Sequence, residues 1–306
     1  MLLVIIDHCT IGLHPTLDHI EVPIFFIISG FLYRPEQFIS MIRKKTERLI
    51  VPYLFFCTLY YIPTLINYFT HGQHTFNIVN DVILFYFLPA NSPLWFLKTL
   101  FWLFILYHTI SWISAHYSKQ KYSIISLAIA ITISLTYYHL NNIIPCKELL
   151  LMSGLPQAIM SLPLFALGTA LHLHTSKIDR YNTPTIFIIA ISCIALWIVC
   201  ARDAILLYSA QFNQYPLLSY ICSTTAFIAL FLITKHIKSI PILSYLGKNS
   251  IIVFGIHLVI ISTLKSMEID SSSAKLLLTI TISLPLTFLL NKYVPRLCGS
   301  RPISSQ

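Results

Sequence analysis

Histidine and carboxylate side chains crowd into a short polar link between two apolar runs near the start of the chain. The link and its borders contain Asp7, His8, His14, Asp18, His19 and Glu21. A neutral imidazole can take a proton from an alcohol near pH 7, and it can also attack an acyl donor as a nucleophile. His8 is therefore the candidate catalytic residue. The alternative is a helical hairpin whose polar turn simply lies in water.

The group that would orient His8 is left open by the sequence. Asp7 is its immediate neighbour, but consecutive side chains on a helix do not face each other. Asp18 or Glu21, beyond the link, are the carboxylates that could fold back toward the imidazole.

Three further residues are candidates for lining a substrate. His257 lies in the middle of a later apolar run, and ionisable residues at membrane depth are functional by default. Ser29, in FFIISGF, could present its hydroxyl to a substrate, or it could form a small-residue packing notch with Gly30. Trp95, in PLWFLK, is an aromatic residue of the kind found at membrane interfaces. We predict that Ser29, Trp95 and His257 line the site.

A basic cluster precedes the third apolar run. It consists of Arg43, Lys44, Lys45 and Arg48. Such a cluster sets membrane orientation, and it can also bind phosphate groups, arginine through a planar fork and lysine as a point charge. We predict that these four residues bind the phosphates of a nucleotide-bearing donor.

The elements that must position these residues are membrane helices. Hydrophobic residues make up 56% of the 306 residues and charged residues only 10%, whereas soluble domains carry about 25% charged residues. We therefore predict an all-α, polytopic membrane protein with about ten transmembrane helices in one domain, 1–306. The expected spans are 1–13, 22–33, 49–69, 94–115, 122–140, 157–173, 183–201, 216–234, 250–266 and 274–291. A surface or re-entrant helix is expected at 78–89.

The net charge of +9 reflects membrane orientation and gives no sign of nucleic-acid binding. Lysines and arginines are dispersed over short loops, with no contiguous basic face. The positive-inside rule places the basic loop and both termini in the cytoplasm. The exceptions, in outer or intramembrane segments, are Lys98, Lys147, Arg202, Lys265 and Lys275. Most of the seven cysteines lie in apolar runs and none forms a CxxC pair, so we predict neither disulfides nor a metal site.

Six segments, in order, resemble one family. They are LLVIIDHC, VPIFFIISGFLY, RKKTERLIVPYLFF, PLWFLKTLF, LPLFALGTAL and LGKNSIIVFGIHLVI. Together they resemble the acyltransferase 3 family of membrane acyltransferases, which includes O-acetyltransferases of sugars and polysaccharides. The family's first-helix histidine falls on His8. The family's arginine eleven positions earlier would precede Met1, so we expect the chain to lack the leading turns of its first helix.

The resemblance implies transfer of an acyl group, acetyl in the usual case, from acyl-CoA to a hydroxyl of a sugar, polysaccharide or glycolipid. No permanently bound cofactor is implied, because acetyl-CoA is a donor substrate, and the expected location is the inner (plasma) membrane. The predicted membrane topology places His8 toward the outer end of its helix, away from the basic cluster. The long arm of the acyl-CoA donor must therefore reach from the cluster to His8. The alternative is a transporter or flippase for a lipid-linked glycan, which predicts charges spread along a path through several spans.

Overall fold

The structure is a computed structural model. The structure describes residues 1–9, 20–71, 86, 93–118, 121–141, 143, 151, 153–178, 182–200, 205–207, 210–212, 215–234 and 240–300. The polar link at 10–19 and the predicted helix at 78–89, apart from residue 86, lie outside these residues.

The described chain is built from helices, which confirms the all-α prediction. In order, the helices are α1 (Leu2–Cys9), α3 (Glu21–Phe31), α4 (Phe38–Lys45), a π-helical turn η1 (Thr46–Ile50), α5 (Val51–His71), α7 (Trp95–Tyr117), α8 (Tyr122–Leu140), α10 (Leu155–Ile178), α11 (Thr183–Cys200), α12 (Pro216–Thr234), α13 (Pro241–Lys248), α14 (Ser250–Ser266) and α15 (Ser272–Tyr293). One antiparallel pair of two-residue strands, β1 (Ile205–Leu206) and β2 (Gln211–Phe212), precedes α12.

Six of the described helices are long and apolar enough to cross a membrane: α7, α8, α10, α11, α12 and α15. The pair α13 and α14, bent by 94°, adds a seventh if it is taken as one span. About ten spans were predicted. The first two predicted spans fall on α1 and α3, which have 8 and 11 residues against the roughly 20 that a span requires. The third falls on α5, which is not among the six.

Two glycines allow α3 and α10 to cross in close contact. A Cβ atom at Gly30 would lie 2.0 Å from the carbonyl oxygen of Phe165, and one at Gly168 would lie 2.0 Å from the carbonyl oxygen of Ile27. Any larger residue at either position would force the two backbones apart. Gly30 thus permits the backbone approach expected of small residues between membrane helices.

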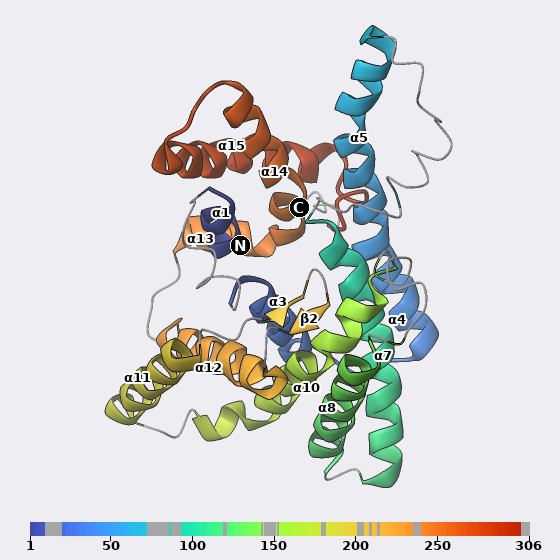
Figure 1. The fold of residues 1–306 in the computed structure, drawn as a ribbon, viewed down its shortest axis with the longest axis vertical. Helices are drawn as coiled ribbons and strands as arrows, with labels where there is room; N and C mark the ends of the chain where they lie inside the picture. The colour runs from blue at the N-terminus through green and yellow to red at the C-terminus, as the bar shows by residue number, and fades with distance from the viewer. Residues whose placement is uncertain are drawn as a thin grey trace, which may run out of the picture.

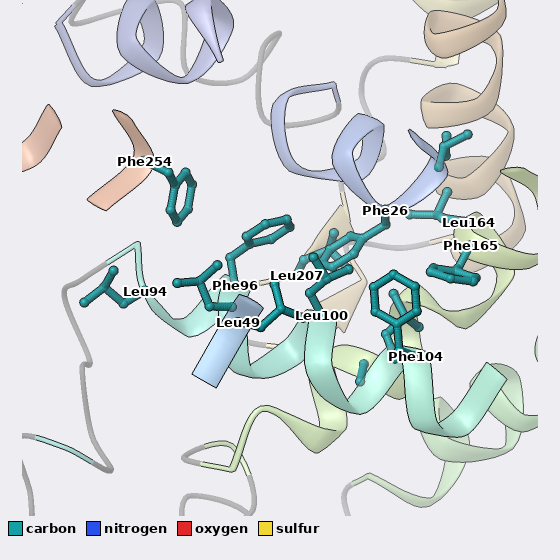
Figure 2. Packing of buried hydrophobic residues seen from close by; sticks show 14 of the residues in the cluster. Phe26, Leu49, Leu94, Phe96, Leu100, Phe104, Leu164, Phe165, Leu207 and Phe254 are labelled. Atoms are coloured by element: carbon teal, nitrogen blue, oxygen red, sulfur yellow. The ribbon is translucent and has the colours of Figure 1, made fainter. Parts of the chain in front are cut away.

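Aromatic side chains fill the core where α3, α7, α10 and α14 meet. The ring of Phe96, on α7, lies 5.1 Å from that of Phe26 and 5.2 Å from that of Phe254. Figure 2 shows these rings among the buried residues of this core. The contacts connect the start of α7 to α14, which carries His257.

A second group of helices forms around α1. Buried Ile5 and Cys9 of α1 pack with Val253 and Ile261 of α14, and with leucine and isoleucine side chains of α15. Figure 1 shows α1 close to α13, α14 and α15, at a distance from α11 and α12. The N-terminal helix is thereby held against helices from the end of the chain.

Candidate functional site

The two histidines singled out in the sequence lie together. The ring centroids of His8, on α1, and His257, on α14, are 5.3 Å apart, with the ring planes tilted by 32°. His257 is fully buried and His8 is half-buried. The packing of α1 against α14 creates this pair. The sequence analysis assigned both residues to one site but did not predict that their rings would be in contact.

The hydrogen bonds of His257 define its tautomer. Its Nδ1 atom lies 2.9 Å from the carbonyl oxygen of Phe254 and 3.2 Å from that of Val253. Carbonyl oxygens only accept, so Nδ1 must carry the proton. In the neutral ring Nε2 is then an acceptor, and it has no hydrogen-bond partner among the described residues. The site therefore contains a bare, buried imidazole nitrogen next to the His8 ring.

The other predicted lining residues lie at different distances from this pair. Trp95 lies at the first turn of α7 and packs against Phe96. Phe96 contacts Phe254, whose ring is 5.7 Å from that of His257, so Trp95 reaches the pair through two aromatic rings. Ser29 is half-buried on α3 beside the Gly30 crossing, and among the described residues no hydrogen bond joins it to either histidine.

The carboxylates proposed to orient His8 are only partly described. Asp7 is buried on α1, with 4% of its surface exposed. Glu21 is the first residue of α3. Burial lowers the pKa of the Met1 amino group, and the negative charge of Glu21 partly offsets this effect. Asp18, like His14 and His19, lies outside the described residues. Within the described chain, no group of three or more His, Cys, Asp or Glu residues is arranged to hold a metal ion.

A row of polar side chains runs along α15, which packs against both α1 and α14, and the sequence analysis missed it. The row has one member every four residues, so neighbouring members lie one turn apart on a ridge that is inclined to the helix axis. The α15 polar row consists of Lys275, Thr279, Ser283, Thr287 and Asn291. Its first four members are buried, and α15 packs against α1, the helix that carries His8. The four-residue spacing was the signal that would have revealed the row.

The four cations of the basic cluster have different surroundings. The Nε atom of Arg43 donates to Glu47 at 3.3 Å, and Lys44 forms an ion pair with Glu36. Lys45 lies over the ring of Phe104, with its Nζ atom 3.4 Å from the centroid. Burial, together with the nearby charge of Arg48, lowers the pKa of Lys45 to about 8.

Arg48 faces a cavity that the other three cations do not line. The cavity has a volume of about 610 Å³, and its lining residues come from η1, the α13–α14 junction, α15 and the C-terminal segment. Lys248 and Asn249, at the α13–α14 junction, and Asn291, at the end of the α15 polar row, line it with Arg48. The structure thus assigns Lys248 and Asn291 to the surroundings of a predicted donor-binding cation.

Comparison with known proteins identifies one family. A family model described as an acyltransferase domain matches residues 1–292. No curated protein and no solved structure matches the chain.

Proposed function

The chain belongs to the acyltransferase 3 family, and from that membership we propose that it is an integral membrane O-acyltransferase. The proposed reaction moves an acyl group, acetyl in the first instance, from acyl-CoA to a hydroxyl of a sugar, polysaccharide or glycolipid. The proposed location is the inner (plasma) membrane, with the basic loop and both termini in the cytoplasm.

The observation that carries this proposal is the pairing of His8 with His257. His8 removes the proton from the acceptor hydroxyl, and the oxygen attacks the thioester carbonyl carbon. The C–S bond then breaks, the acyl group stays on the acceptor oxygen, and the departing thiolate takes the proton from His8. Atoms and charge balance without a further reactant, and His8 returns to its neutral state.

His257 supports His8 in this scheme by its charge state. Two protonated imidazoles at this separation would repel each other in a buried site, so a proton on one disfavours a proton on the other. The neutral tautomer of His257 also offers its bare Nε2 to the substrate hydroxyl or to water. Together these effects keep one imidazole available as a base.

The remaining predicted residues bind the substrates in this proposal. The positive potential of Arg43, Lys44, Lys45 and Arg48 attracts the phosphates of the donor, and Arg48 is the member that lines a cavity. We propose that Trp95, on α7, and Ser29, on α3, contribute to the same substrate-binding region.

The test compares His8→Ala with wild-type protein in membranes. Acetyl transfer from labelled acetyl-CoA to cell-surface glycans should fall by about 10²-fold or more, the usual contribution of a general base. Mass analysis of the glycans shows whether acetyl or a larger acyl group is added. His174→Ala is the matched control, because His174 lies exposed near the end of α10. Full activity of His8→Ala, with normal membrane insertion of both variants, would contradict the mechanism.

A further inference from the structure

The cavity beside Arg48 lies where two distant parts of the chain meet. The start of α14 and the end of α15 form two of its walls, and Cys298, Gly299 and Ser300 form another. Asn291 of α15 donates a hydrogen bond to the side chain of Asn249, which precedes α14. This bond joins the two helices at the cavity.

The lining is positively charged. Arg48 and Lys248 both line the cavity, and none of its described lining residues is an aspartate or glutamate. Neither cation forms an ion pair with a described residue. Arginine presents a planar fork and lysine a point charge, and both suit phosphate oxygens. Their charges are therefore available to an anionic ligand.

The backbone beside Arg48 is irregular and lies close to the C-terminal segment. Arg48 lies in the π-helical turn η1, a distortion that is frequent at functional sites. Gly299 has φ +71°, and a Cβ atom there would lie 2.8 Å from the carbonyl oxygen of Arg48 and 2.8 Å from Cγ of Pro52. Only glycine lets the C-terminal segment approach this turn so closely.

Unpaired buried hydroxyls lead from the cavity to the histidine pair. Thr287 and Ser283 follow Asn291 along the α15 polar row, and both are fully buried, with no hydrogen-bond partner for their hydroxyl oxygens among the described residues. Helices α14 and α15 follow each other in the chain and pack together. His257 lies eight residues after Asn249, and Ser283 lies eight residues before Asn291. Ser283 is therefore level with His257, about 12 Å from the cavity along the helices.

We infer that this cavity binds the phosphate groups of a phosphate ester, and that Thr287 and Ser283 hydrogen-bond the polar arm that extends from it toward His257. Buried hydroxyls are costly when unpaired, and the amides of an acyl-CoA arm supply the missing partners. The assignment to acyl-CoA rests on the proposed function. The same phosphate chemistry occurs in anionic lipid headgroups, so the two sources must be separated by experiment.

The experiment measures the affinity of the full-length protein for coenzyme A in phosphatidylcholine nanodiscs. Arg48→Gln and Lys248→Gln should each weaken binding about tenfold, because a hydrogen bond to a charged group contributes roughly that much. Thr287→Val, which keeps the side-chain shape, should weaken binding severalfold. Lys292→Gln and Arg296→Gln are the matched controls: both cations are exposed near the cavity without lining it, and binding should stay within about twofold of wild type.

A second measurement separates the two sources of phosphate. Nanodiscs that contain phosphatidylglycerol test whether the lipid competes with coenzyme A, and co-purified phosphatidylglycerol is counted in each variant. Lipid retention that falls in Arg48→Gln and Lys248→Gln, with coenzyme A affinity unchanged, assigns the cavity to headgroups and overturns the donor assignment. No change in either ligand overturns the cavity as a phosphate site.

The same set of proteins distinguishes a failure of this inference from a failure of the proposed function. His8→Ala should bind coenzyme A as wild type does while losing transfer. If the wild-type protein transfers the acyl group and both cavity variants bind coenzyme A as tightly as wild type, only the cavity assignment is wrong. If the wild-type protein neither binds coenzyme A nor transfers an acyl group, the proposed function is wrong. The lipid measurement then still decides whether the cavity binds phosphate groups.

Discussion

The ring of His8 lies 5.3 Å from the ring of His257, although one helix begins the chain and the other lies near its end. The Nδ1 proton of His257 is held by the carbonyl oxygens of Val253 and Phe254, which aims a bare Nε2 away from its own backbone. Neighbouring imidazoles of this kind behave as one titrating unit. Their effects on catalysis should therefore depend on each other.

We expect His257→Ala to lower acyl transfer by about tenfold to a hundredfold, less than His8→Ala, because His257 supports the base in our scheme. In a double-mutant cycle the loss from both changes should be much smaller than the product of the two single losses, as for other residues that act as a unit. Initial rates with acetyl-CoA provide the measurement. Independent, multiplicative effects would argue against a functional pair.

Gly30→Ala should destabilise the protein by about 1–3 kcal/mol or more, because its new Cβ atom would lie 2.0 Å from the carbonyl oxygen of Phe165. Thermal unfolding in detergent gives the measurement. Gly247→Ala is the matched control, since a Cβ atom at Gly247 meets nothing within 4 Å. Equal unfolding temperatures for the two variants would show that α3 and α10 do not cross as closely as described.

The affinity for coenzyme A should fall as the pH rises through about 8. Lys45 has its pKa lowered to about 8 by burial and by the charge of Arg48, so it loses its proton in this range and the basic cluster loses one positive charge. A bound phosphate favours the charged form, so binding at pH 8.5 should be accompanied by proton uptake.

Lys45→Arg tests the source of this pH dependence. Arginine stays protonated throughout the range, so the fall near pH 8 should flatten in this variant. Isothermal titration in buffers of different ionisation enthalpy measures both the affinity and the proton uptake. The same pH dependence in wild type and Lys45→Arg would show that another group is responsible.

Gly299→Ala should weaken coenzyme A binding as well as stability. The alanine would have to adopt a φ near +71°, and its Cβ atom would press on the carbonyl oxygen of Arg48. Gly154→Ala is a control of similar backbone strain, with φ +78° but beside Thr99 instead of the cavity. We expect both variants to unfold at lower temperature, and only Gly299→Ala to lose affinity. Equal affinities would separate the C-terminal segment from the cavity.

The sequence by itself determined the class of the protein and its family. Sparse charge and long apolar runs can fold stably only as membrane helices, because the bilayer interior offers no water to satisfy the backbone. The segments around His8, Gly30, Arg48 and His257 carried the family resemblance, which the family model confirms over residues 1–292. These features are local, and local patterns can be read from one chain.

Only the tertiary structure decided which of these residues meet. Periodicity places a side chain on a face of a helix, and it does not say which helix packs there, because membrane helices pair through detailed packing rather than through a hydrophobic pattern. The contact of His8 with His257 and the joint lining of a cavity by Arg48 and Lys248 depend on such packing. So does the burial of Ser283 and Thr287 between the cavity and the histidine pair, which gave the α15 polar row its proposed role.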